Sequence, residues 1–158
     1  MKKILCLVLA MSFAIFAAGC SSVEFEDTNG PDDYSLTQIT DDNIVKLDVG
    51  AANYSQKPGS DDSDNLSKMT EFKSDNFNGV AEIYRNHLLG KSDLTIDVSN
   101  LQVDSGNYRL SVVQDGEIIY DFPLNEMLQT YELRDTNGDI SIVMSGESAD
   151  FYMSIQVW

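Results

Sequence analysis

Cysteine is almost absent from this 158-residue sequence: the only two are Cys6 and Cys20, and residues 21–158 contain none. The larger part of the chain therefore has no thiol for a disulfide, a thiolate zinc site or a cysteine nucleophile. Any domain there has to be stabilised by its hydrophobic core alone. A domain of roughly 90–115 residues is large enough for that.

Histidine is as scarce, because His87 is the only one. A nucleophilic triad needs a base, and no Gly-x-Ser-x-Gly turn accompanies this histidine. A single histidine without cysteine does not make a typical zinc site either. The sequence also has no phosphate-binding Gly-x-x-x-x-Gly-Lys-Ser/Thr loop. We therefore predict a protein that is not an enzyme and that carries no cofactor.

Basic residues are few as well: 10 Lys and Arg stand against 26 Asp and Glu, a formal net charge of −16. Such an acidic surface repels nucleic acid and anionic lipid headgroups, and it attracts cations or basic partners. We therefore predict no nucleic-acid partner. With 26 acids, some close pair of carboxylates is inevitable, so a small carboxylate-dependent hydrolase stays as an alternative to a binding protein.

Long apolar runs are missing from residues 21–158, where no window approaches the roughly eighteen apolar residues of a membrane-spanning helix. One shorter run exists near the start, where Ile4 to Phe16 follows Lys2 and Lys3 and precedes Ala17. This three-part layout is typical of a secretory signal peptide. The run of about thirteen residues is too short to cross a membrane, which takes about twenty.

The four residues after this run, Ala17-Ala18-Gly19-Cys20, resemble the lipobox of bacterial lipoproteins, although that family usually has leucine at the position of Ala17. The resemblance implies that residues 1–19 are a signal peptide. It also implies that a dedicated peptidase recognises Ala17, Ala18 and Gly19, and that Cys20 is acylated, for example with palmitate. Two or more acyl chains anchor a protein stably. The expected location is extracytoplasmic, lipid-anchored to the cell membrane or, in an organism that has one, to the outer membrane.

Removal of residues 1–19 would leave eight basic and 26 acidic side chains, a net charge of −18. Residues 20–42 are polar and acidic, and we interpret them as a flexible tether. The domain is expected over residues 43–158, with its compact part from about residue 66. A first strand is predicted around Ile44, Leu47 and Val49.

The rest of the sequence alternates apolar and polar residues with a period of two, which is typical of strands with one buried face. Each alternating set lies on one side of a pleated sheet. We therefore predict an all-β fold, an antiparallel β-sandwich that is Ig-like or jelly-roll-like, with a small β-barrel as the alternative. The residues predicted to face the core are Leu94, Ile96, Val98, Tyr108, Leu110, Val112, Ile118, Tyr120, Phe122, Tyr131, Leu133, Ile140, Ile142, Met144, Phe151, Met153, Ile155 and Val157.

Dipeptides that favour turns separate these segments. We predict type I′ hairpin turns, which need positive φ at two consecutive residues, at Asp115-Gly116 and Asn137-Gly138. Two more turns are predicted at Asn78-Gly79 and Ser145-Gly146-Glu147, and one short helix over residues 124–129.

A second resemblance rests on the run Gly106-Asn107-Tyr108-Arg109-Leu110-Ser111-Val112, on Gly116 and on the strand over residues 151–157. These segments are similar to the C-terminal half of many small lipoproteins of Gram-positive bacteria. In that group, a Gly-x-Tyr/Leu-x-Leu strand is followed by hairpins and an aromatic-rich strand. The resemblance implies a small β-sandwich and no known chemistry.

Two acidic segments place side-chain oxygens close together, which is the ligand type that calcium prefers. The second segment resembles the opening of an EF-hand loop, but its glycine comes two residues too early and no closing glutamate follows. We interpret the first segment as a solvated loop and the second as a turn, and predict no metal site. The candidate ligands are Asp61, Asp62 and Asp64 in the first segment, and Asp135, Asn137 and Asp139 in the second.

Aromatic residues supply the last candidates. Trp158 is the only tryptophan, and Tyr152 shares its face by the period of two. Two such rings exposed on a sandwich form a ligand platform of the kind that stacks on sugar rings, whereas the alternative is packing in a core or at an edge. We predict a domain that binds a carbohydrate or protein partner at the cell surface. A structural component of the cell envelope without a small ligand remains the alternative.

Overall fold

The computed structural model describes residues 26–27, 39–47, 50, 53–57 and 66–158. Because the predicted signal peptide and most of the predicted tether lie outside these ranges, the division of the chain into signal peptide, tether and domain stays a prediction. Seven candidate residues also lie outside the described residues: Ala17, Ala18, Gly19, Cys20, Asp61, Asp62 and Asp64.

Strands dominate the described part of the chain. Each pairing between strands is antiparallel, which confirms the predicted all-β, antiparallel class. The sheet is not closed into a barrel, so the alternative of a small β-barrel is wrong. The elements are β1 (Glu26–Asp27), α1 (Asp41–Lys46), β2 (Ser55–Lys57), β3 (Thr70–Gln114), β4 (Glu117–Asp121) and β5 (Glu126–Val157).

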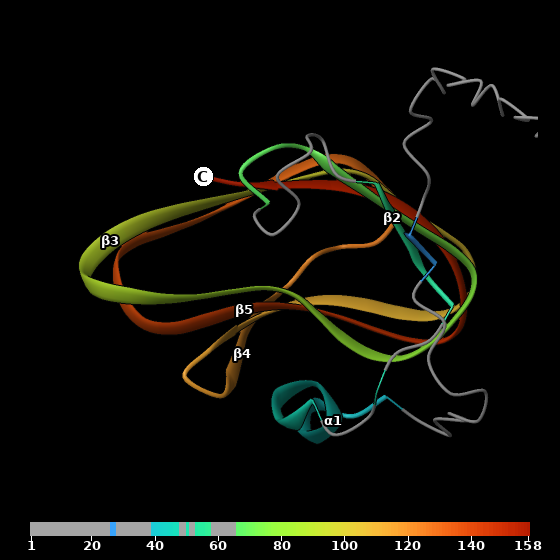
Figure 1. Ribbon diagram of the computed structural model, residues 1–158, viewed down its shortest axis with the longest axis horizontal. Coiled ribbons are helices and arrows are strands. Elements are labelled where there is room, and N and C mark those ends of the chain that lie inside the picture. Colours follow the sequence, from blue (N-terminus) through green and yellow to red (C-terminus); the bar gives the residue numbers. More distant parts are fainter. Residues whose placement is uncertain (1–25, 28–38, 48–49, 51–52, 58–65) are drawn as a thin grey trace, which may run out of the picture.

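The two long strands, β3 and β5, form one antiparallel ribbon, which runs from the pair Thr70–Ile155 to the pair Leu101–Glu126. The ribbon folds back on itself, so that β3 pairs with β5 a second time along the other edge of β5. Ile155, for example, faces Thr70 on one side and Val98 on the other. The result is two layers of sheet, one above the other in Figure 1, and this rolled ribbon corresponds to the jelly-roll-like form of the predicted sandwich.

The short strands extend the sheet at its edges. β2 pairs with the beginning of β3, with Ser55 opposite Lys73, and β1 pairs with β2. β4 pairs with the end of β3 in the lower layer, where Gln114 lies opposite Glu117. α1 lies beneath this lower layer in Figure 1.

Three of the four predicted turns are wrong, because their residues lie inside the long strands. Asn78-Gly79 belongs to β3, whereas Asn137-Gly138 and Ser145-Gly146-Glu147 belong to β5. The segments on either side of each dipeptide pair with the opposite long strand rather than with each other. Gly79 and Gly138 have φ of 108° and 97°, so glycine bends the strand here instead of ending it.

The hairpin predicted at Asp115-Gly116 is confirmed. Both residues have positive φ, 49° and 82°, as a type I′ turn requires. The turn joins the end of β3 directly to β4.

The main core lies between the two layers and consists mostly of the alternating residues predicted from the sequence. Fifteen of the eighteen predicted residues are buried, and Ile118, Tyr120 and Tyr131 are half-buried. Aromatic rings fill one end, where Phe77 packs edge-on against Phe151 with 5.6 Å between ring centroids. Burial of these alternate side chains explains why each strand has one apolar face.

The strand predicted around Ile44, Leu47 and Val49 is wrong, because Asp41–Lys46 forms the helix α1. Thr40 caps the helix by accepting a hydrogen bond from the backbone N–H of Asn43, and the Asn43 side chain accepts one from the Thr40 N–H in return. Ile44 is fully buried against Val80, Val113 and Val143, on the outside of the lower layer. No helix of the described residues is long and apolar enough to span a membrane.

The short helix predicted over residues 124–129 is also wrong. β5 begins at Glu126, and its first residues pair with β3, with Leu128 opposite Ser99. The leucine and methionine residues that gave the segment a helical spacing are exposed, including Met127 and Leu128. Pairing with a distant strand therefore overrides the local pattern.

Candidate functional site

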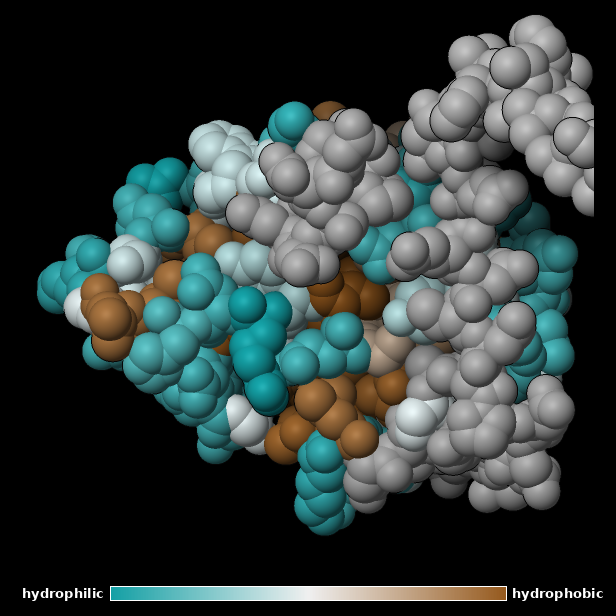
Figure 2. Space-filling model, in the orientation of Figure 1, coloured by the Kyte–Doolittle hydropathy of each residue, from teal (hydrophilic) through white to brown (hydrophobic). Residues whose placement is uncertain are grey.

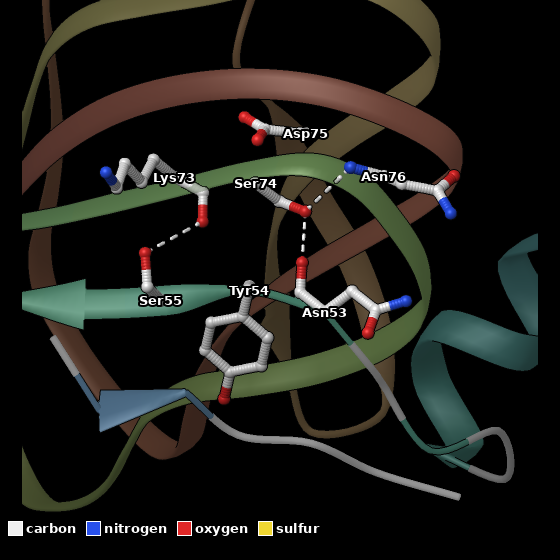
Figure 3. Close-up of a pocket in the computed structure, with 7 residues that line it drawn as sticks. All are labelled: Asn53, Tyr54, Ser55, Lys73, Ser74, Asp75 and Asn76. Carbon is white, nitrogen blue, oxygen red and sulfur yellow. Dashed lines mark hydrogen bonds between the residues drawn. The ribbon is translucent and has the colours of Figure 1, made fainter. Parts of the chain in front are cut away.

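A hollow of about 360 Å³ lies where β2 meets the beginning of β3 (Figure 3). We call it the polar hollow, because amide, hydroxyl, ammonium and carboxylate groups surround a single aromatic ring. Such a mixture suits a small ligand that is rich in hydroxyl groups. The lining residues are Asn53, Tyr54, Ser55, Lys73, Ser74, Asp75 and Asn76.

Hydrogen bonds and core packing hold the walls of the polar hollow in place. The Ser74 hydroxyl donates to the carbonyl of Asn53 and accepts from the backbone N–H of Asn76, which is 3.1 Å away. The Tyr54 ring packs edge-on against Phe77 of the main core, with 5.8 Å between centroids. The ring is thus fixed from behind by the core, and the polar groups are positioned by the backbone.

A second hollow, of about 320 Å³, lies between α1 and the lower layer. Ile44, Val113 and Val143 form part of its apolar floor, and Figure 2 shows apolar surface beside α1. Its charged rim is partly neutralised, because Glu82 lies 3.1 Å from Arg85. The Glu82 carboxylate also accepts a hydrogen bond of 2.5 Å from the Ser141 hydroxyl.

The predicted ligand platform lies on the outside of the upper layer. Phe151, Met153, Ile155 and Val157 point into the core, so the alternate residues of β5 point outward. The side chains on this surface are mostly polar, and we call it the outer sheet face. Its central residues are Thr95, Asp97 and Ser99 of β3, Leu128 and Thr130 of β5, and Tyr152, Ser154, Gln156 and Trp158 at the end of β5 and just beyond it.

Trp158 is exposed on this face and firmly held. Its side chain is 66% exposed, yet its indole Nε1–H donates a hydrogen bond of 2.9 Å to Oδ2 of Asp97. The other oxygen of Asp97, Oδ1, accepts a hydrogen bond of 2.6 Å from the Thr130 hydroxyl. The backbones of Trp158 and Thr95 exchange two hydrogen bonds, of 2.7 and 3.0 Å.

Tyr152 lies on the same face but apart from Trp158. The two are six positions apart along an extended backbone, which corresponds to about 20 Å. The Tyr152 hydroxyl lies 3.4 Å from that of Ser154, and the ring is only half-exposed. The two rings therefore share a face without forming one continuous platform.

The three calcium candidates within the described residues have different partners. Oδ1 of Asp139 lies 2.7 Å from Nδ1 of His87, and Oδ1 of Asp135 lies 3.7 Å from Nζ of Lys91. The carbonyl of Asn137 accepts a hydrogen bond from Gln114. Among the described residues, no three His, Cys, Asp or Glu side chains are grouped as a metal site would require.

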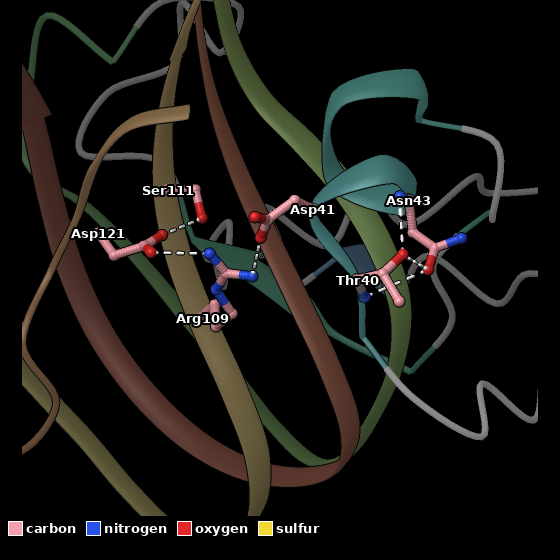
Figure 4. Close-up of polar contacts among 6 residues, drawn as sticks. All are labelled: Thr40, Asp41, Asn43, Arg109, Ser111 and Asp121. Atoms are coloured by element: carbon pink, nitrogen blue, oxygen red, sulfur yellow. Dashed lines mark hydrogen bonds and ion pairs between the residues drawn. The ribbon is translucent and has the colours of Figure 1, made fainter. Parts of the chain in front are cut away.

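Arg109 joins α1 to the sheet (Figure 4). Its Nη1 lies 2.7 Å from Oδ1 of Asp41, and its Nη2 lies 2.7 Å from Oδ2 of Asp121. Partial burial lowers the pKa of Arg109, but the hydrogen bonds to both carboxylates outweigh this and raise it. The Asp121 carboxylate also accepts a hydrogen bond from Ser111. The network holds α1 in place and leaves the arginine fully charged.

Sequence reasoning identified Trp158 and Tyr152 but missed Asp97 and Thr130. The polar positions in the alternating pattern indicate that both face outward, but their contact with the tryptophan depends on the register between β3 and β5. No protein-family model matches the sequence, and no curated protein is significantly similar to it. The function of this chain therefore has to be inferred from its own residues.

Proposed function

We propose that this chain is the precursor of a bacterial lipoprotein. It is cut before Cys20, is held to the outer side of a membrane by acyl chains, and binds a ligand or partner there without converting it. The observation that carries the location is the sequence from Lys2 to Cys20: a positive start, an apolar run too short to span a bilayer, and small residues before a cysteine. Two or more acyl chains on Cys20 are sufficient for stable anchoring.

The described surface supports binding rather than catalysis. The outer sheet face offers polar side chains and a fixed, exposed tryptophan on a rigid sheet, which is a suitable base for recognition. His87, the only histidine, is exposed and hydrogen-bonded to Asp139. The polar hollow adds a second concave surface beside β2.

Acylation of Cys20 is the direct test of the anchor. Cells that express the full chain are grown with an alkyne-tagged palmitate analogue, and the labelled protein is separated by detergent phase partitioning. We expect the wild-type protein to carry the label and to enter the detergent phase. Cys20→Ala should do neither, because the variant has no acylation site.

Cys6→Ala provides the matched control, since Cys6 lies in the segment that the proposal removes. This variant should be labelled as strongly as the wild-type protein. A labelled Cys20→Ala protein, or an unlabelled wild-type protein, would overturn the lipid anchor.

A further inference from the structure

We infer that Trp158 stacks on a pyranose ring of a neutral or basic glycan, and that Asp97 accepts hydrogen bonds from hydroxyl groups of the same sugar. The inference rests on the proposed function in one respect, namely that the domain binds a ligand. It does not depend on the lipid anchor. It names the class of ligand and the residues that contact it.

The tryptophan ring is both exposed and held by hydrogen bonds. Its side chain is 66% exposed, while its Nε1–H is bound to Asp97 and its backbone is paired with Thr95. A ring held in this way loses little conformational freedom when a ligand covers it. The hydrogen bond also consumes the only polar atom of the indole, so its faces are left for apolar contact.

Hydrogen-bond acceptors lie beside the tryptophan ring. Asp97 accepts one hydrogen bond at each oxygen, from Trp158 at 2.9 Å and from Thr130 at 2.6 Å. A carboxylate has about four acceptor sites, so about two remain for ligand hydroxyl groups. Among the described residues, Asp97 forms no ion pair. Its negative charge is therefore not neutralised by a described cation, and only these two hydrogen bonds stabilise it.

Together these features match a sugar better than a peptide. A pyranose has an apolar face of C–H groups and a polar rim of hydroxyl groups, and a fixed ring with an adjacent carboxylate contacts both. An apolar peptide would need a continuous apolar surface, whereas Thr95, Asp97 and Gln156 surround the tryptophan here.

The negative charge of the protein limits the glycans that it can bind. The chain has a net charge of −16, and the carboxylate nearest to the tryptophan is Asp97. Glu132 also lies near the edge of the outer sheet face, where it is paired with Arg134. Anionic polysaccharides would be repelled, whereas neutral or amino sugars would not.

The position of Tyr152 indicates an oligosaccharide rather than a single sugar. It lies about 20 Å from Trp158 along the strand direction, which is too far for one sugar ring to contact both. The two rings would instead contact separate units of one oligosaccharide that lies along β5. Between them Gln156 is half-buried and Ser154 is only 6% exposed, so the sugar units between the two rings would span Ser154 without contacting it.

The test uses the fact that Trp158 is the only tryptophan, so its fluorescence reports on this site alone. The full chain is purified in a detergent without a sugar head group and titrated with four hexasaccharides. Cellohexaose and chitohexaose are neutral, the glucosamine hexamer is basic, and hexagalacturonate is the anionic comparison. We expect a blue shift of the emission with at least one neutral or basic probe and none with hexagalacturonate.

Three variants, compared by calorimetry with the best probe, distinguish stacking from other contacts. Trp158→Ala should weaken binding by about tenfold or more, and Trp158→Phe, which keeps an aromatic face, by no more than about threefold. Leu128→Ala is the comparison for apolar contact, because Leu128 is 71% exposed on the same face but has no aromatic ring, and it should weaken binding much less than Trp158→Ala does.

Several results would overturn the inference. One is the absence of any emission shift with the neutral and basic probes, and another is unchanged binding by Trp158→Ala. Equal weakening by Leu128→Ala and Trp158→Ala would point to apolar docking instead. Acylation of Cys20 is measured separately from sugar binding. A protein that is labelled but does not bind sugar would contradict only the sugar inference. A protein that binds sugar but is not labelled would contradict only the lipid anchor.

Discussion

The two hydrophobic clusters in the described part of the chain are built in different ways. The main core lies between the layers, and it draws on alternate residues of β3 and β5 along the whole ribbon. The second cluster lies outside the lower layer, where Ile44 of α1 covers Val80, Val113 and Val143. The main core thus has many contributors from two long strands, whereas the second cluster depends on one helix of six residues.

We therefore expect α1 to open locally, whereas the two layers should unfold together. A side chain of the main core contacts both layers, so its loss weakens the entire sandwich. A side chain of α1 contacts only one patch of the lower layer, so its loss releases the helix before the sheet. Three experiments, two single substitutions and one double-mutant cycle, separate these two behaviours.

Leu110→Ala should have the largest effect. Leu110 is fully buried in the main core, and removing it should lower the free energy of unfolding by about 2–5 kcal/mol. Urea denaturation followed by circular dichroism measures this change. Glu117→Ala, on the exposed edge of β4, is the control and should change stability by less than about 0.5 kcal/mol. A Leu110→Ala protein with the stability of the wild type would contradict the assignment of the inner face.

Ile44→Ala should have a smaller and more local effect. Ile44 is also fully buried, but its loss should cost no more than about 2 kcal/mol, at the low end for such a truncation, because α1 can detach. Hydrogen exchange should show faster exchange of the α1 amides and unchanged protection of β3 and β5. Equal loss of protection in both regions would mean that α1 is an integral part of the main core.

The ion pair between Arg109 and Asp41 should have the smallest effect. The Arg109 side chain is 30% exposed, so solvent screens the pair, and its coupling energy should be about 0.2–1 kcal/mol. A double-mutant cycle of Arg109→Ala and Asp41→Ala measures it, and the coupling should fall in high salt. A coupling energy of zero at low salt would show that Arg109 does not help to hold the helix.

The inner face of the sandwich is predictable from the sequence because burial imposes a period of two. Ile140, Ile142 and Met144 illustrate this, since each is fully buried as the pattern indicates. The bends are not predictable in the same way. A glycine after asparagine, as at Gly79 and Gly138, permits either a hairpin or a bent strand, and only distant pairing decides between them.

The helix α1 was not predicted, because it has few apolar residues and the residues that it packs against are distant in the sequence. Thr40 and Asn43 form a capping box, but with asparagine in place of the usual glutamate or glutamine. Val113 and Val143 lie on the outer, otherwise polar face of their strands, and α1 covers them there. A pattern read along one strand cannot show what covers it from outside.

Of the candidate site, the aromatic residues could be predicted and their surroundings could not. The spacing of Tyr152 and Trp158 places both on one face, as the structure also has it. The hydrogen bond from Trp158 to Asp97 joins residues from two strands, and so depends on register. The polar hollow likewise joins a short segment around Asn53 to the beginning of β3.

The position of β5 in the sheet also determines when the protein can fold. Both halves of β3 pair with β5, and β3 precedes it in the chain. While the chain is synthesised from its N-terminus, the only described strands that can pair with β3 before β5 exists are the short strands β2 and β4. Its apolar face stays uncovered until β5 arrives, and such long-range pairing is slow and prone to aggregation. The two layers can therefore form only after β5 is available.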